Sequence, residues 1–277
     1  MTTSRSGADF DRKNQDRYST GNLSHRFDSG GQWIDLGERA AVKSVAAASW
    51  GRPILDIGIG AGRTTSLLTM LTDDYVGIDY SQGLIERAQQ AFPDLDIRFG
   101  DARDLSAFSN KKFGLVVFSY NGIDSVGHEN RALILSQICG VLAPDGHFVY
   151  STLNKRGPFF NKQPWSSDRA NSPRSLPDRS ARFVVRVMLD NREYRRRLSE
   201  WWRMRNTVED HGDWGMGPLG GPGSGLLMHW STPAATSREL AEAGLQAVAF
   251  FDTSGKRLAD GEDATSWCFH IVTERAA

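Results

Sequence analysis

The 277-residue chain has no excess charge of either sign, because 33 Lys and Arg residues balance 33 Asp and Glu residues. Without a basic field, a surface has no general attraction for nucleic acid. No apolar run approaches the ~20 residues that a membrane-spanning helix needs, and the polar stretch 1–16 is unlike a signal peptide. We therefore expect a cytoplasmic protein with no membrane partner and no nucleic-acid partner.

Cysteine is scarce as well. The two cysteines, Cys139 and Cys268, lie in apolar stretches, where buried free thiols are common. The sequence has no C-x-x-C pair and no short-spaced Cys/His cluster, so it predicts no metal site. No Tyr is followed four positions later by Lys, the pair that a short-chain dehydrogenase would need. This absence disfavours one class of nicotinamide-dependent enzyme.

The most informative segment present is 54–65, ILDIGIGAGRTT. An apolar run is followed by glycines at alternate positions, Gly58, Gly60 and Gly62, and then by a run that suits a helix. Such a pattern is typical of a strand, a tight turn and a helix start, where backbone approaches a ligand closely. Asp79 ends the next apolar run, and a carboxylate there suits a ribose diol. These features predict a nucleoside ligand, but a nicotinamide cofactor fits them too.

Apolar strand patterns and helical patterns alternate along most of the chain, which predicts a parallel, doubly wound α/β sheet. Further strands are predicted at 94–99, 113–118, 147–152, 246–252 and 266–273, and helices at 35–50, 82–91 (with Ser81 as N-cap), 132–141, 182–206 and 237–243. Residues 211–225 contain seven glycines and two prolines, and we expect no regular element there.

Five segments, in this order, resemble the class I S-adenosylmethionine-dependent methyltransferases: LDIGIGAGRTT, VGIDYS, GDARDL, GLVVFSYNGIDS and VLAPDGHFVYSTLN. The resemblance covers roughly residues 50–155, and more loosely 231–274. It implies a seven-stranded, mostly parallel Rossmann-like sheet whose last strand is antiparallel. The expected parts are an N-terminal capping segment (1–50), a cofactor-binding core (51–155), an inserted substrate lid (156–230) and the end of the core sheet (231–277).

The resemblance also implies roles for single residues. Asp56 and the three glycines would hold the methionine end of S-adenosylmethionine, and Asp79 would bind the ribose. The remaining cofactor residues implied are Tyr80, Asp101, Ala102, Ser119 and Tyr120.

Methyl transfer depends mainly on proximity and alignment, but a hydroxyl acceptor also needs a base. The candidate catalytic residues are His128 and His229. The candidate acceptor-site residues are Tyr18, Asn121, Asn154, Arg156 and Trp230. Residues 155–210 are rich in Arg, including Arg195 to Arg197, which indicates either a lid that recognises an anionic acceptor or a solvated helix face.

The sequence thus predicts a methyltransferase that acts on an N or O atom of a small molecule, as a monomer or homodimer. Positions 119–122 read Ser-Tyr-Asn-Gly rather than the Asn-Pro-Pro-Tyr or Asp-Pro-Pro-Tyr of many nucleic-acid enzymes of the family, which favours a small acceptor. The alternatives are an NAD(P)-binding oxidoreductase, a cofactor-binding regulator without turnover, and an RNA or protein methyltransferase.

Overall fold

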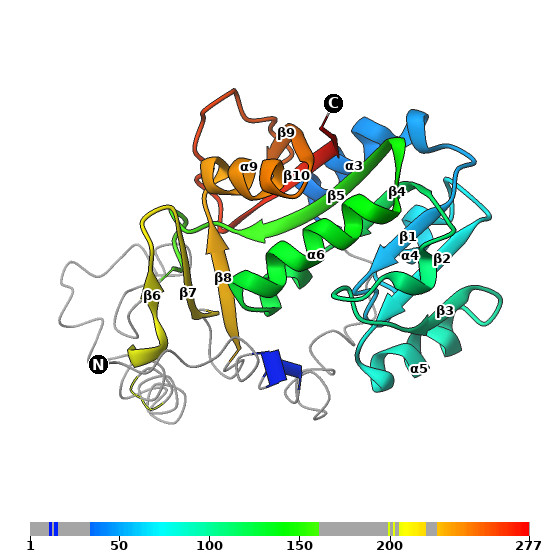
Figure 1. Ribbon diagram of the computed structural model, residues 1–277, viewed down its shortest axis with the longest axis horizontal. Helices are drawn as coiled ribbons and strands as arrows, with labels where there is room; N and C mark the ends of the chain where they lie inside the picture. Colours follow the sequence, from blue (N-terminus) through cyan, green and yellow to red (C-terminus); the bar gives the residue numbers. More distant parts are fainter. Residues whose placement is uncertain are drawn as a thin grey trace, which may run out of the picture.

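The computed structural model describes residues 11–12, 14–15, 34–160, 199, 202, 205–219 and 226–276. Its centre is a seven-stranded sheet of order β3-β2-β1-β4-β5-β10-β9 (Figure 1). The strands are β1 (Ile54–Ile57), β2 (Tyr75–Asp79), β3 (Asp96–Phe99), β4 (Phe113–Phe118), β5 (Leu142–Leu153), β9 (Leu245–Asp252) and β10 (Cys268–Arg275). The first five run parallel, and β10 is antiparallel to both of its neighbours. The predicted fold class is confirmed.

Five helices accompany the sheet in the described residues: α3 (Leu36–Ser49), α4 (Thr65–Leu68), α5 (Gln82–Ala91), α6 (His128–Val141) and α9 (Pro233–Glu242). Alternate side chains of β4 pack on opposite faces of the sheet. Leu115 and Val117 pack in the cluster that contains α3, while Val116 and Phe118 pack in the cluster that contains α6. Figure 1 shows α6 crossing β4 and β5 on one face. Side-chain caps fix two helix starts, because Asp35 accepts from the Glu38 amide and Thr232 accepts from the Ala235 amide.

Three local features refine the predictions. Ser81 stands at the N-cap of α5 as predicted, although its side chain makes no capping hydrogen bond. The helix after the glycine turn is α4, a single turn, so its dipole contributes little to ligand binding. Strand β5 begins five residues earlier than the predicted 147, and a register shift against β4 accompanies the Pro-Asp-Gly segment near its start.

A second, three-stranded sheet of order β6-β7-β8 lies beside the start of α6 (Figure 1). Its strands are β6 (Glu209–Asp210), β7 (Trp214–Pro218) and β8 (Leu227–Ser231). The expectation of no regular element in 211–225 is therefore wrong for β7. The glycines of β7 lie under aromatic rings: a Cβ on Gly215 would come within 2.8 Å of the Phe160 ring. Glycine in a strand often marks such a close approach rather than a loop.

Two 3₁₀ turns follow strand ends of the main sheet, η1 (Ser106–Phe108) and η2 (Gly122–Ser125), and η3 (Arg205–Thr207) precedes β6. No helix among the described residues is long and apolar enough to cross a bilayer. Most of the helix predicted at 182–206 lies outside the described residues, and the division of the chain into four parts stays a prediction.

Candidate active site

The glycine turn sits at the carboxyl end of β1, and its backbone explains its composition. Gly58, Gly60 and Gly62 have φ angles of 65°, 58° and 91°, a region that residues with a Cβ rarely adopt. A Cβ on Gly58 would lie 2.7 Å from the Phe118 ring, and one on Gly62 would lie 2.4 Å from the Phe92 ring. A Cβ on Gly60 would meet no atom of the described residues within 4 Å. Gly60 is therefore the position where the turn leaves room for a ligand.

Asp79 ends β2 directly beside this turn. Its Oδ2 accepts from the Gly60 amide at 2.9 Å, and its Oδ1 accepts from the Ser81 amide at 2.8 Å. Burial raises the pKa of Asp79, while these amides lower it. Two backbone donors hold the carboxylate in one orientation, and each oxygen retains lone-pair capacity for a hydroxyl. This is the arrangement that a ribose diol requires.

Asp56 lies inside the protein rather than at its surface. The side chain is fully buried, and its Oδ2 accepts from the Thr64 and Tyr75 hydroxyls, each at 2.9 Å. Burial is the largest influence and raises the pKa of Asp56 to about 7. Asp56 therefore stabilises the segment that follows the glycine turn through its hydrogen bond with Thr64. Its contact with the methionine end of the cofactor stays a prediction.

A cavity opens at the ends of β2, β3 and β4, where the resemblance implied the adenosine. Its lining includes the predicted residues Tyr80, Asp101 and Ala102, together with Phe118 and Val126. The Asp101 carboxylate forms an ion pair with Arg103. The guanidinium donates to it through Nε and through Nη2, the latter at 2.5 Å. This ion pair lowers the pKa of Asp101 against the opposing effect of burial.

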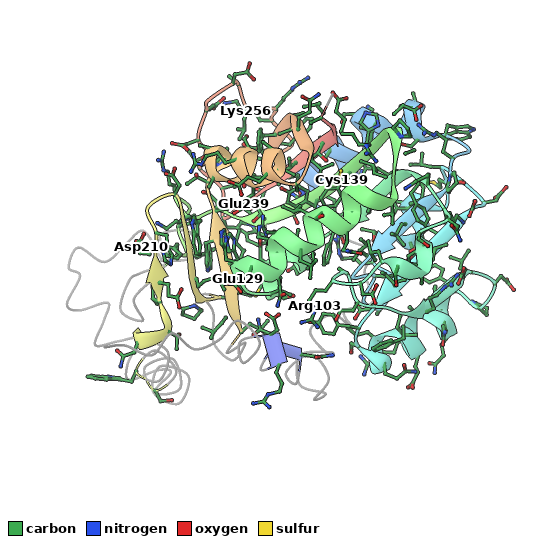
Figure 2. All side chains as sticks on the ribbon, in the orientation of Figure 1. Arg103, Glu129, Cys139, Asp210, Glu239 and Lys256 are labelled. Carbon is green, nitrogen blue, oxygen red and sulfur yellow. The ribbon has the colours of Figure 1, made fainter. Side chains whose placement is uncertain are left out.

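Residues of the N-terminal segment form one side of this cavity. The sequence predicted this segment as a cap but did not indicate which of its residues line the site. Asp11 lines the cavity and accepts from the Gly127 amide at 2.8 Å and from Arg103 at 3.1 Å. Asn14 donates to the Ser125 and Leu227 carbonyls, at 2.7 and 2.6 Å. In Figure 2, Arg103 lies next to this short segment. Nothing in the local pattern of 1–34 could have identified Asp11 or Asn14.

The end of β4 carries two residues in a rare conformation. Tyr120 and Asn121 have φ angles of 52° and 58°, although neither is glycine. Such strain clusters at functional sites. The Asn121 amide donates to Ser151 Oγ at 2.8 Å, whereas its buried side-chain Oδ1 has no hydrogen-bond partner among the described residues. Ser119 is buried beside them. The turn after β4 therefore encloses an amide oxygen that has no hydrogen-bond partner among the described residues.

Arg63, the residue directly after Gly62, has an intramolecular partner. Its guanidinium makes two hydrogen bonds to Glu38 of α3, at 2.6 and 2.8 Å, and lies 5.2 Å from the centre of the Tyr120 ring. Arg63 therefore ties α3 to the residues around the turn.

The two candidate catalytic histidines lie together although 101 positions separate them. His128, the first residue of α6, places its Nδ1 3.0 Å from Nε2 of His229 on β8. Trp214 of β7 stacks on the His128 ring with centroids 3.8 Å apart. His229 is fully buried, whereas 38% of the His128 side chain is exposed. Burial lowers the pKa of both rings, so both are uncharged near neutral pH.

A buried ion-pair network lies next to the histidines. Arg131 of α6 donates to Asp124 at 2.5 Å and to Glu239 of α9 at 2.8 Å. Asp124 also accepts from the Thr152 hydroxyl and the Leu153 amide, each at 2.7 Å. Figure 2 shows Glu239 between α9 and α6, close to β8. The network ties η2, α6, α9 and β5 together at the carboxyl edge of the sheet.

The predicted acceptor-site residues differ in burial and in the partners of their side chains. Asn154 is enclosed and donates to the Ala264 and Ser266 carbonyls, and Trp230 is fully buried and donates to the Gly217 carbonyl. Both side chains are therefore explained by structure alone. Arg156 is exposed but pairs with Asp263, and Tyr18 and Arg195 to Arg197 lie outside the described residues.

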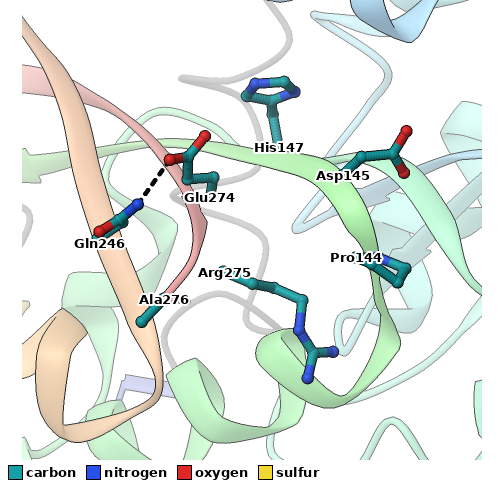
Figure 3. A pocket seen from close by; sticks show the side chains of 7 residues that line it. All are labelled: Pro144, Asp145, His147, Gln246, Glu274, Arg275 and Ala276. Carbon is teal, nitrogen blue, oxygen red and sulfur yellow. Dashed lines mark hydrogen bonds between the residues drawn. The ribbon is translucent and has the colours of Figure 1, made fainter.

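A second cavity lies at the opposite, amino-terminal edge of the parallel strands (Figure 3). Its lining combines the start of β5 with the end of β10, including His147, Glu274 and Arg275. None of the predicted site residues lies there, so we place the active site at the carboxyl edge.

Part of the sequence is similar to known proteins. Residues 54–146 match the model of a family described as a methyltransferase domain. A demethylmenaquinone methyltransferase of Renibacterium salmoninarum is 29% identical over 123 residues, covering 44% of this chain and 50% of that relative. The match thus spans about half the length of the curated relative.

Solved structures show the same fold. The CcbJ methyltransferase from Streptomyces caelestis superposes with a TM-score of 0.61 at 18% identity, covering 94% of this chain and 98% of that one. A 1,6-didemethyltoxoflavin-N1-methyltransferase of Burkholderia thailandensis gives a TM-score of 0.59 at 12% identity, covering 100% and 93%.

Residues 54–146 of this chain therefore match a methyltransferase domain, and the fold is that of solved methyltransferase structures. The glycine turn, β2 and the edge of the adenosine-side cavity all fall within its matched residues, 54–146. The parts that complete the carboxyl edge, namely β8, α9 and the N-terminal segment, fall outside the matched residues of the methyltransferase domain.

Proposed function

We propose that this chain binds S-adenosylmethionine and transfers its methyl group to a nitrogen or oxygen atom of a small molecule. The observation that carries the proposal is the pairing of Asp79 with the open glycine Gly60. The carboxylate offers two oriented oxygens to a ribose, and the turn leaves room for the methionine end next to it. Structural neighbours that are N-methyltransferases support a small acceptor.

The reaction breaks the sulfonium–methyl bond as the acceptor's lone pair forms the new bond to carbon, so the cofactor leaves as a neutral thioether. The acceptor atom then loses its proton. An amine needs no positioned base for that step, whereas a hydroxyl does. Asn121, whose amide oxygen is enclosed and has no hydrogen-bond partner among the described residues, stays a predicted acceptor-site residue. A role for His128 and His229 in removing the proton stays a prediction.

An anionic acceptor has less support. Arg156 was the described residue best placed to recognise one, and its guanidinium is paired with Asp263 and lies 3.8 Å from Asp213. We therefore do not include an anionic group in the proposed acceptor.

Two measurements test the proposal. Titration calorimetry should show binding of S-adenosylhomocysteine and no binding of NAD. The protein should then be incubated with methyl-labelled S-adenosylmethionine and a metabolite extract, and labelled products identified by mass spectrometry. Binding of NAD alone would instead indicate an oxidoreductase. Cofactor binding with no labelled product from any extract would indicate a regulator without turnover.

A further inference from the structure

Three potential metal ligands meet where α6, β8 and α9 come together. Nδ1 of His128 and Nε2 of His229 are 3.0 Å apart, and Oε1 of Glu239 lies 3.9 Å from the first and 3.7 Å from the second. Ligand atoms on one ion approach each other to similar distances. From these three separations, a point equidistant from the atoms lies about 2.1 Å from each, which matches zinc–nitrogen and zinc–oxygen bond lengths.

Glu239 has a free ligand atom, and a metal ion would take the place of the proton that the two histidine nitrogens share in their hydrogen bond. Arg131 occupies Oε2 of Glu239, but Oε1 is buried without a hydrogen-bond partner among the described residues. A buried carboxylate oxygen without a donor is costly, and a cation would satisfy it. The Arg131 charge is itself paired with Asp124, so it does not leave the cluster positive.

Access to the cluster comes from one side. His229 is fully enclosed, and Glu239 is nearly so, whereas the His128 side chain is 38% exposed. An ion held by three protein ligands with one exposed side would retain an open coordination position, as catalytic rather than structural zinc sites do. His211 is close by but stacks on the far face of Trp214, with centroids 4.0 Å apart, and so is separated from His128 by the indole.

We propose that His128, His229 and Glu239 bind one divalent transition-metal ion of the zinc type, with an open position toward solvent. Two imidazoles and one carboxylate are a donor set that suits zinc and its neighbours better than calcium or magnesium. The prediction of no metal site followed from the lack of short-spaced ligands. This site draws on residues separated by up to 111 positions, which only the fold brings together. The proposal does not depend on the methyl acceptor.

The other cluster of metal-binding residue types in the described structure is less suited. Asp35, Cys268 and His270 also lie close together, but Asp35 Oδ1 is already used as the cap of α3 and as the partner of His270 at 2.9 Å. Burial raises the pKa of the Cys268 thiol, which disfavours the thiolate that would bind a metal.

The test uses the full chain, stripped of metal with a chelator and titrated with Zn²⁺ in competition with a chromophoric chelator. One equivalent should bind, and Co²⁺ in its place should give visible absorption bands of a nitrogen- and oxygen-ligated ion. His128→Ala and Glu239→Gln should each weaken binding at least about 100-fold, because even the loss of an outer-shell partner costs about 10- to 100-fold. His211→Ala is the matched control and should retain the affinity.

His128→Ala is preferred to His229→Ala because His128 is partly exposed, and circular dichroism melting should confirm that each variant is folded. Absence of stoichiometric binding by the wild type would overturn the proposal and leave a hydrogen-bonded histidine pair. Equal losses in His211→Ala and His128→Ala would also overturn it, because binding would then lie at another place.

Discussion

Glycine can occur at position 60 because the backbone needs a positive φ angle or because a ligand approaches it closely. The substitution Gly60→Ala distinguishes these two reasons. The new Cβ would meet no atom of the described residues within 4 Å, so none of them has to move to accommodate it. The remaining cost is the φ angle of 58°, which for a residue with a Cβ is roughly 1–2 kcal/mol. For a chain of this size that corresponds to a melting temperature lower by about 2–8 °C. The Gly60 amide is retained, so its hydrogen bond to Asp79 can persist.

The effect on cofactor binding should be larger than the effect on folding. If the methionine end of the cofactor occupies the space beside Gly60, the methyl group would overlap it and weaken S-adenosylhomocysteine binding at least about tenfold, or 1.4 kcal/mol. Calorimetry at a temperature where the variant is fully folded measures this loss. Gly83→Ala is the control, because Gly83 lies inside α5 with nothing within 4 Å, and its affinity should not change. Wild-type affinity in Gly60→Ala would show that no ligand approaches the turn there.

Four further substitutions test the site and its support. Asp79→Ala should weaken S-adenosylhomocysteine binding by about 1–3 kcal/mol in calorimetry, because it removes charge-assisted hydrogen bonds; unchanged binding would remove Asp79 from the ribose site. Asn121→Ala should lower kcat/KM about 10- to 100-fold with little change in cofactor affinity, and a loss confined to cofactor affinity would contradict the acceptor role. Burial raises the pKa of Asp56 to about 7, so its favourable contribution is complete below pH ~4 and is lost as the pH rises toward 7. Asp56→Asn should therefore gain urea stability relative to the wild type between pH 4 and pH 8, and a constant difference would refute that assignment. Arg131→Met should lower the free energy of unfolding by about 3–5 kcal/mol, because it leaves Asp124 and Glu239 buried without their cation; a loss below 1 kcal/mol would contradict this.

The centre of the main sheet could be predicted because β1, β2 and β4 are buried on both faces and each ends at a recognisable turn. Strand β4 was predicted at its observed bounds, 113–118, and its residues are all buried. Helix α5 was likewise predicted at 82–91, because Leu84, Ile85 and Ala88 form its buried side. Such patterns are local, so a single sequence shows them.

The acceptor side could not be predicted in the same way, because its structure depends on contacts between distant residues. The sequence of β7, Trp-Gly-Met-Gly-Pro, has poor strand propensity, and pairing with β8 places it in a sheet. The meeting of His128 with His229 follows from that pairing and from the position of α6, and no spacing in the chain signals it. Arg156 was singled out for its charge, but only the fold shows that Asp263 is its partner.

The second sheet is attached to the cofactor-binding core by backbone contacts rather than by side chains alone. Asn154, directly after β5, forms a bridge with Ser231 at the end of β8, and the Lys155 amide donates to the Ser231 carbonyl at 3.0 Å. Helix α9 begins two residues later, and Glu239 extends from it to Arg131 of α6. His229 therefore sits on a strand that is fixed at one end to β5 and is packed against η2. Side chains on such fixed elements hold a geometry more precisely than side chains on loops. This rigidity explains how residues outside the matched methyltransferase domain can line its carboxyl edge in a defined arrangement, and it is the part of the molecule where we expect the choice of acceptor to be determined.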